Sequence, residues 1–258
     1  MLLKKYVVLC LFLLFSANAI SDKLTISVQE FPPFITVEQG RVTGAFAEIV
    51  EKISLHSEIE IETLLHPNRR SKALLKEGYV NANFPLGWNE ERDKWLYWSL
   101  PLMSTEYGFF TRINEGEEYN SIESFSGMKV GVFGPSNTSY SLERLSEVIE
   151  GKGLEPINMK MLPNSNGQNL KKLVAKRIDA VYLNRDLGEY QIKALEIVGA
   201  EYLLGVEQIN YYIGFSKENT SKELVNKFNE SIRYLKDKGE IGTILSTYNI
   251  RAAHEEIE

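Results

Sequence analysis

Residues 23–28 read KLTISV, and residues 44–53 read GAFAEIVEKI. In the first stretch apolar and polar side chains alternate, which is the period-two pattern of a β-strand. In the second stretch apolar residues recur at the spacing of one helix face, namely Phe46, Ile49, Val50 and Ile53. A strand followed by an amphipathic helix is a building unit of parallel sheets, so this region predicts an α/β fold.

The alternation of strands and helices continues to the C-terminus. Further strands are expected around residues 59–61 and at 128–133, 159–162, 179–183 and 211–215. Further helices are expected at residues 70–77 and 141–149, from Leu170 onward, and along the apolar face of residues 225–235. Residues 114–118 are polar and aperiodic, which is typical of a loop, and they separate two sets of strands and helices. The chain is therefore predicted to form two lobes.

The N-terminus has the pattern of a cleaved secretory signal peptide covering residues 1–19. Lys4 and Lys5 precede an apolar run over residues 6–15, and Ala17-Asn18-Ala19 supplies the small residues that signal peptidase accepts. A membrane anchor is the alternative, but such a run of roughly ten residues is about half of what a bilayer needs. The only cysteine, Cys10, lies in this segment, so the mature chain is predicted to have no disulfide and no thiolate site. The predicted location is the periplasm.

The charge of the chain argues against nucleic acid as a partner. The formal net charge is −6, and it becomes −8 when Lys4 and Lys5 leave with the signal peptide. Binding to nucleic acid depends instead on cationic contacts to phosphate. After the signal peptide, no apolar stretch is long enough to cross a membrane.

Sequence motifs of catalysis and cofactor binding do not occur. The histidines, His56, His66 and His254, lack the spacing of metal ligands. There is no Gly-x-Ser-x-Gly elbow and no Walker loop. We therefore predict no cofactor, no metal site and no catalytic residues, and expect that the chain is not an enzyme.

A series of short segments, in order along the chain, carries a family resemblance. They are VQEFPPF (28–34), GAFAEIV (44–50), PNRR (67–70) with EG (77–78), NEERDKWLYWSLPL (89–102), IESFSGMKVGV (122–132), RIDAV (177–181) and LSTY (245–248). Together they resemble the bacterial extracellular solute-binding proteins of family 3, which serve the uptake of polar amino acids. The resemblance covers nearly the whole mature chain.

This resemblance implies a two-lobed periplasmic binding protein-like fold of type II. Each lobe is then expected to hold a doubly wound, mostly parallel sheet. Two crossover strands are expected to join the lobes as a hinge, with a ligand in the cleft between them. The implied boundaries give residues 20–109 and 211–258 to lobe 1 and residues 110–210 to lobe 2.

Arg92 is the strongest candidate for a ligand contact. It matches the arginine that, in amino-acid binders of this family, forks onto the α-carboxylate of the ligand. A planar guanidinium suits this role because two parallel charge-assisted bonds fix orientation as well as energy. Trp88 is a candidate stacking platform for a cation or a ring. Phe31 is a candidate aromatic wall of the cleft, and Arg70 stands where some relatives carry a site arginine; core packing and a surface charge are the respective alternatives.

The stretch Ser136-Asn137-Thr138 lies between a predicted strand and a predicted helix. Backbone N–H groups at a helix start can receive an anion, and these side chains can also cap the helix. All three residues are therefore candidate ligand contacts. Tyr107 and Tyr212, at the predicted crossovers, are weaker candidates.

Asn184 marks a departure from the family pattern. Amino-acid binders keep an acidic residue for the ammonium of the ligand five positions after the equivalent of Asp179, whereas this chain has an amide there. An amide accepts a hydrogen bond but carries no charge. Asp186 and Glu30 are the alternatives for an acidic partner. Two positions where the family often has serine hydroxyls near the carboxylate are occupied here by Pro85 and Gly87.

The leading functional hypothesis is a periplasmic protein that closes on a small polar or anionic solute and passes it to an ABC permease. We expect it to act as a monomer. The resemblance leaves two alternatives open. One is a periplasmic enzyme of the same fold, similar to a cyclohexadienyl dehydratase. The other is a sensory module that presents its ligand to a membrane receptor.

Overall fold

The computed structural model describes residues 22–114, 119–162 and 167–253. The predicted signal peptide, most of the predicted loop at 114–118, and His254 lie outside the described residues. Within the described ranges, no helix combines the length and apolar character needed to span a bilayer.

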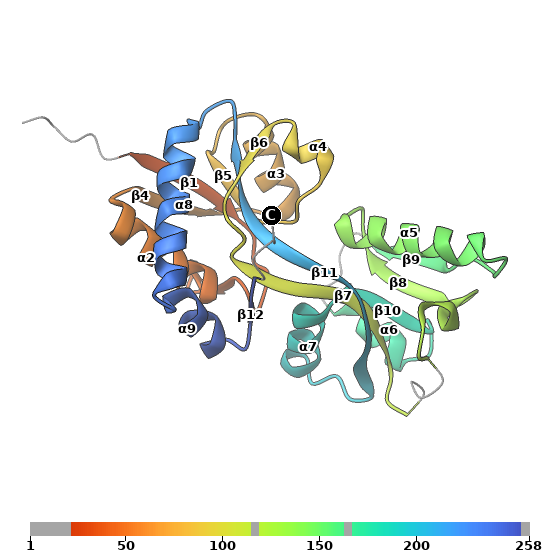
Figure 1. The fold of residues 1–258 in the computed structure, drawn as a ribbon. Helices are drawn as coiled ribbons and strands as arrows, with labels where there is room; N and C mark the ends of the chain where they lie inside the picture. Colours follow the sequence, from red (N-terminus) through yellow and green to blue (C-terminus); the bar gives the residue numbers. More distant parts are fainter. Residues whose placement is uncertain (1–21, 115–118, 163–166, 254–258) are drawn as a thin grey trace, which may run out of the picture.

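The chain folds into two lobes that are joined by two long strands (Figure 1). Lobe 1 contains β1 (Lys23–Val28), β2 (Thr36–Glu38), β3 (Arg41–Thr43), α2 (Ala45–Ser57), β4 (Glu60–Leu65), α3 (Asn68–Lys76), β5 (Ala82–Leu86), α4 (Glu90–Asp93), β6 (Leu96–Trp98), α8 (Lys222–Asp237) and α9 (Glu240–Thr247). Lobe 2 contains the 3-10 helix η2 (Ile122–Phe125), β8 (Lys129–Phe133), α5 (Asn137–Gly151), β9 (Asn158–Leu162), α6 (Gln168–Val174), β10 (Ala180–Asn184) and α7 (Arg185–Ala194). The joining strands are β7 (Met103–Arg112) and β11 (Ala200–Ser216), and the short β12 (Arg251–Ala252) pairs with β7.

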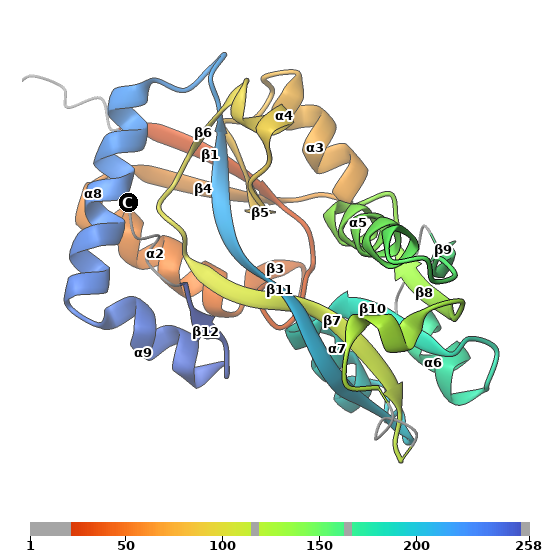
Figure 2. The same ribbon diagram turned by 45° about the vertical axis from the view of Figure 1, so that its right-hand side comes forward.

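One mixed sheet runs through both lobes in the order β4-β1-β5-β11-β7-β10-β8-β9. Pairing is parallel among β4, β1 and β5 in lobe 1, and among β10, β8 and β9 in lobe 2. It is antiparallel where the lobes meet β11 and β7. Helices cover the faces of each half, as the two views of the ribbon show (Figures 1 and 2). The predicted α/β fold with two lobes and two crossover strands is confirmed.

The predicted strand at 211–215 is only the last part of β11, which extends back to Ala200. Its pairing with β7 shifts register twice, between Tyr202 and Leu204 and between Gly205 and Glu207. Each shift breaks the period-two pattern by which a strand is read from sequence, and this is why the first half of β11 was missed. The predicted lobe boundaries, at 109/110 and 210/211, fall inside β7 and β11 and stay a prediction.

Gly108 and Gly205 face each other in the middle of this crossover. A Cβ atom at Gly108 would stand 2.3 Å from the carbonyl oxygen of Leu204, far inside van der Waals contact. The two strands therefore approach each other more closely here than any side chain allows. On the same ladder, Glu106 pairs with Arg185 of α7 at 3.0 Å and with Arg251 of β12 at 3.5 Å. One carboxylate thus connects an arginine of lobe 2 with one from the C-terminal strand that follows lobe 1.

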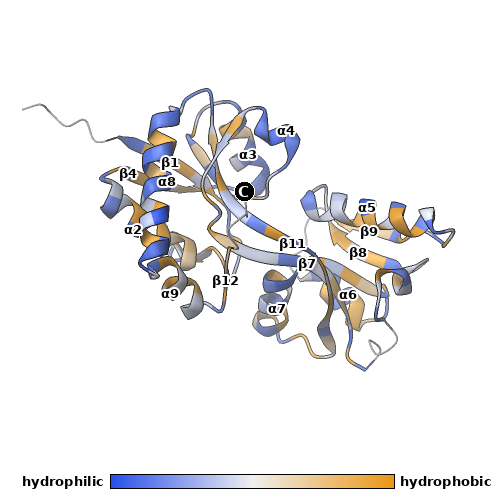
Figure 3. Ribbon diagram, in the orientation of Figure 1, coloured by the Kyte–Doolittle hydropathy of each residue, from blue (hydrophilic) through white to orange (hydrophobic). Residues whose placement is uncertain are grey.

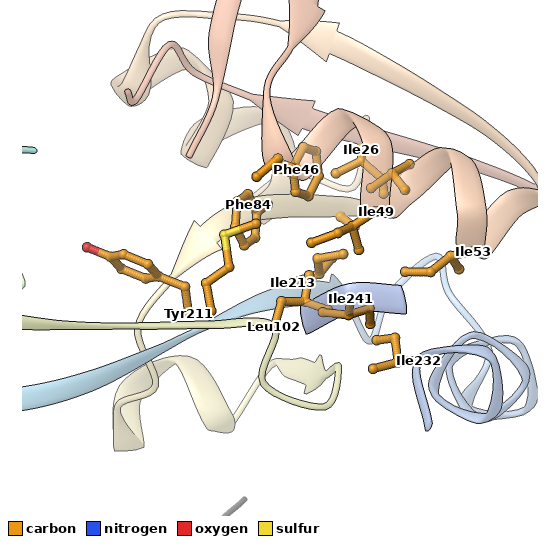
Figure 4. Packing of buried hydrophobic residues seen from close by; sticks show 14 of the residues in the cluster. Ile26, Phe46, Ile49, Ile53, Phe84, Leu102, Tyr211, Ile213, Ile232 and Ile241 are labelled. Carbon is orange, nitrogen blue, oxygen red and sulfur yellow. The ribbon is translucent and has the colours of Figure 1, made fainter. Parts of the chain in front are cut away.

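Helix α2 shows how the sequence pattern becomes the core of lobe 1. Its buried residues are Ala45, Phe46, Ile49, Val50, Ile53 and Ser57, which form one face of the helix. Phe46 is fully buried and stacks on Phe84 of β5 with ring centroids 4.2 Å apart. Figure 4 shows these side chains meeting those of β11 and the C-terminal helices. The core of lobe 1 therefore joins the two ends of the chain.

The core of lobe 2 lies on both faces of its half of the sheet. One cluster packs around Phe109, Phe125 and Tyr182, and the other around Phe110, Leu173 and Val181. Both clusters are made of residues from one continuous part of the sequence, between Tyr107 and Ile209.

Replacing Phe46 with Ala is expected to destabilise the protein by about 3–5 kcal/mol, because it removes a buried ring and leaves a cavity. Leu55→Ala, on the same helix but 73 % exposed, is the control and should change stability by less than about 0.5 kcal/mol. Urea unfolding followed by circular dichroism measures both. Equal losses in the two variants would contradict the placement of the α2 face.

Candidate functional site

A cavity of about 300 Å³ lies where the two lobes meet the crossover strands. Residues from three places line it. They are Gly87, Trp88 and Asn89 of lobe 1; Tyr107, Glu207, Gln208, Ile209, Asn210 and Tyr212 of the crossover strands; and Asn137, Tyr140 and Arg144 of α5.

The cavity lies at the carboxyl ends of two strands, β5 in lobe 1 and β8 in lobe 2. Each of these strands pairs in parallel within its own lobe. Residues 87–89 follow β5, and residues 134–136 connect β8 to the N-terminus of α5. Ligand sites in open α/β sheets form at this end of the strands. A Cβ atom at Gly87 would lie 2.9 Å from Nδ2 of Asn137, so the two segments nearly touch across the cavity.

Arg92 lies beside this cavity, in the short helix α4. Asn89 begins α4, since its side chain accepts a hydrogen bond from the backbone N–H of Arg92 at 2.9 Å. The guanidinium Nη1 of Arg92 donates to the carbonyl oxygen of Gly87 at 2.8 Å. Desolvation by burial lowers the pKa of Arg92, while charge interactions with Tyr107, Glu91 and Tyr140 oppose this. The described residues include no carboxylate in an ion pair with Arg92.

Lys72 of α3 is a second cation in the same place. Its pKa is lowered to about 8, first by desolvation and then by the positive charge of Arg92. The side chain is exposed, so it is reached by solvent even though neighbouring groups displace part of its hydration. Helices α3 and α4 are drawn largely in hydrophilic colours in Figure 3. Two close positive charges are unfavourable unless an anion joins them.

Two aromatic side chains approach the cavity from opposite lobes. Trp88 is 53 % exposed and Tyr140 is 51 % exposed, although large aromatic side chains usually bury most of their area. Tyr107 and Tyr212, both buried, contribute from the crossover strands. The cavity wall thus combines aromatic surface with amide and charged groups.

Polar groups beneath the cavity form a connected chain. The hydroxyl of Tyr107 interacts with those of Thr138 and Tyr211, and Nδ2 of Asn184 donates to Oη of Tyr211 at 2.9 Å. Burial raises the pKa of Tyr107 and of Tyr211, so both phenols remain neutral and available as hydrogen-bond donors. Figure 4 shows the hydroxyl of Tyr211 pointing away from the apolar cluster of lobe 1.

Comparison with known proteins is consistent with this architecture. The sequence profile of the bacterial extracellular solute-binding proteins, family 3, matches residues 24–250. The chain belongs to this family. No curated protein sequence matches this solute-binding protein.

Solved structures share the fold at low sequence identity. A probable amino-acid ABC transporter extracellular-binding protein from Bacillus subtilis is 16 % identical, with a TM-score of 0.77 over 88 % of this chain and 97 % of that one. An amino-acid ABC transporter substrate-binding protein from Streptococcus pneumoniae, bound to L-arginine, is 20 % identical, with a TM-score of 0.71 over 88 % and 94 %. A histidine kinase sensor domain is 18 % identical, with a TM-score of 0.76 over 90 % and 99 %.

The structure brings part of the predicted site together. Trp88 and Asn137 line the cavity, and Arg92 and Thr138 contact residues that line it. Ser136 is the N-cap of α5, where its hydroxyl accepts from the N–H of Ser139 and donates to the carbonyl of Phe133. With this capping box, α5 begins at Asn137, four residues before the predicted helix start at Ser141.

The other candidates lie outside the cavity lining. Asn184 is buried, and besides contacting Tyr211 its side chain accepts from the N–H of Leu187 as the N-cap of α7. Phe31 is half-buried and stacks on Phe34 with centroids 5.4 Å apart. Arg70 is exposed in the first turn of α3. Their roles as ligand contacts stay predictions.

Sequence reasoning missed several residues that line the cavity, above all Tyr140, Arg144 and Glu207. Asn137, Tyr140 and Arg144 recur at the spacing of one helix face, and this polar face opposite the buried one was a usable signal. Glu207 gave no such signal, because its direction depends on the register shift in β11. The described residues contain no group of three or more side chains that could hold a metal ion.

Arg92→Met is expected to raise the pKa of Lys72 above 8 and toward its ordinary value, because a neighbouring positive charge is removed. Arg70→Met, two residues from Lys72 in α3, is the control and should leave that pKa unchanged. Carbon-13 NMR titration of labelled lysine side chains measures the value. An unchanged Lys72 pKa in Arg92→Met would show that the two cations are not neighbours.

Proposed function

We propose that this chain is a periplasmic solute-binding protein that captures a small polar or anionic, amino-acid-like solute. The observation that carries the proposal is the cavity between the lobes, next to which Arg92 stands without a carboxylate partner among the described residues. Membership of a solute-binding family supports the same function.

Binding on this scaffold works by closure of the lobes. The cavity is lined from both lobes and from the strands that join them, so a solute that contacts all three favours the closed arrangement. Trp88 and Tyr140 are half exposed in the present arrangement. Closure would bury part of this aromatic surface against the solute, which is a favourable contribution to binding.

The solute carries a carboxylate or a similar anionic group in this proposal. Arg92 and Lys72 supply positive charge on one side of the cavity, and a bound anion relieves their mutual repulsion. Structural relatives bind L-arginine in one case and L-glutamate in another. Both of these ligands have an α-carboxylate, and this shared group is the one we assign to Arg92.

The partner in the membrane is an ABC permease, and the protein acts as a monomer. Several structural relatives are binding proteins of amino-acid ABC transporters. A histidine kinase sensor domain among the structural relatives supports the sensory alternative. A permease gene and an ATPase gene beside this one would favour transport, and a kinase gene would favour sensing.

A binding role is proposed in place of catalysis. The dehydratase alternative needs an acid in the cavity, and Glu207 lies there, but the sequence carries none of the catalytic motifs considered above. Turnover of a prephenate-like acid by the purified protein would overturn the non-enzymatic assignment.

A panel of amino acids, amines, carboxylates and small peptides should include a compound that raises the melting temperature, since a ligand well above its Kd stabilises the native state. The same compound should reduce the radius of gyration in small-angle X-ray scattering if the lobes close. Arg92→Met should weaken its binding roughly tenfold or more, as expected for a lost charged hydrogen bond. The control, Arg233→Met on the exposed face of α8, should bind as the parent does. Unchanged affinity in Arg92→Met would exclude Arg92 from the site.

Expression of the full chain in a bacterium should yield a periplasmic protein that begins at Ile20, because residues 17–19 have the pattern of a signal-peptidase site. Mass spectrometry of osmotic-shock fractions measures the N-terminus. Ala19→Arg should block cleavage, whereas Ala253→Arg, far from the site, should not. Recovery of an uncleaved chain from the membrane fraction would favour the anchor.

A further inference from the structure

A carboxylate projects into the cavity from the hinge itself. Glu207 belongs to β11, pairs with Tyr107 of β7, and lines the cavity. The register shift lies directly before it, between Gly205 and Glu207. Such bulges turn a side chain away from the direction that regular pairing would give it, and they recur next to binding sites.

The contacts of Glu207 leave it able to accept another donor. Its Oε2 accepts from the hydroxyl of Ser141, and Nη2 of Arg144 lies 3.2 Å from Oε2 and 3.3 Å from Oε1. A carboxylate offers about four acceptor positions, so Oε1, with a single long contact, has capacity left. The Glu207 side chain is 39 % exposed and that of Arg144 is 60 % exposed. An ion pair this exposed to solvent contributes little free energy, so a competing cation can replace Arg144 as the partner of Glu207.

Opposite charges thus face the same small cavity. On the side of lobe 1, Arg92 donates to the carbonyl of the lining residue Gly87, with Lys72 as its neighbouring cation, and Glu207 lines the cavity from β11. Tyr107, which lines the cavity, has charge interactions with both Arg92 and Glu207, so both charges lie near this one residue. This arrangement matches a solute that carries a negative and a positive group a short distance apart.

We propose that Glu207 binds a positively charged amino group of the solute, so that the ligand is a zwitterion held between Arg92 and Glu207. The inference rests on the proposed function, since it assumes that the cavity is the ligand site. The acidic group that contacts the ammonium is then Glu207 of β11, and not a residue at position 184. The amide of Asn184 is occupied by Leu187 N–H and Tyr211, and it carries no charge.

A purely structural role is the competing explanation for Glu207. Through Ser141 and Arg144 it ties β11 to α5, and a variant that loosens this tie would weaken binding of every ligand alike. The two roles differ in one respect. Only an ammonium contact makes the effect of the substitution depend on the amino group of the ligand.

The experiment measures binding of matched pairs of compounds by calorimetry. L-Glutamate, L-phenylalanine and L-arginine are each compared with the carboxylic acid that lacks only the α-amino group. The proteins are the parent, Glu207→Gln, and the control Glu201→Gln, which changes the same residue type on β11 at a position paired with Thr111 and outside the cavity lining.

We expect the parent to bind at least one amino acid and to bind its deaminated counterpart roughly tenfold or more weakly. Glu207→Gln should reduce the affinity for that amino acid by a similar factor and leave the affinity for the deaminated acid unchanged. Glu201→Gln should alter neither. Equal losses for both members of a pair, or no loss, would overturn the assignment of Glu207.

The comparison within the parent protein does not depend on any variant being folded. If deaminated acids bind the parent as well as the amino acids do, the ammonium site is absent while the solute-binding function stands. If neither series binds at millimolar concentration to folded, ligand-free protein, the proposed amino-acid-like solute is wrong and the role of Glu207 falls with it.

Discussion

The antiparallel ladder between β7 and β11 is the element on which the rest of the molecule depends. Its paired residues run from Met103 with Tyr211 to Arg112 with Ala200, so it reaches from the sheet of lobe 1 into that of lobe 2. A ladder of this length is stiff along its strands, but the two register shifts and the facing glycines 108 and 205 concentrate twist at its middle. Tyr107 and Glu207, next to this point, line the cavity, so a solute in the proposed site would contact the joining strands directly.

Charge is distributed unevenly over the molecule. The chain carries a net charge of −6, yet Arg92 and Lys72 stand together beside the cavity and repel each other. Some other cations are paired with carboxylates, for example Lys52 with Glu240 and Lys227 with Asp22. Two positive charges therefore stand close together beside the cavity, where they would attract an incoming anion.

Much of the fold was accessible from sequence because its elements follow simple periods. The apolar faces of α2 and α8 and the strand at 23–28 were visible in this way. Arg92 was accessible through the family resemblance, and Trp88 through its aromatic side chain close to Arg92 in the sequence. Glu207 was not, because its orientation depends on a shift in pairing between strands that lie far apart in sequence. The two contacts of the Asn184 side chain were also not predictable. Capping α7 and donating to Tyr211 are interactions that exist only in the folded chain.

The inserted position of lobe 2 has a consequence for the order in which the molecule folds. The cores of lobe 2 draw on residues between Tyr107 and Ile209, all of which precede α8 and α9 in the chain. The core of lobe 1 joins Ile26 and Phe46 to Phe228 and Ile241, and such distant contacts form slowly. Lobe 2 can therefore fold before the C-terminal helices are present, whereas the first hundred residues need these helices to complete the core of lobe 1. Until those helices pack, the exposed apolar faces of β1 and α2 are the surfaces most prone to aggregation.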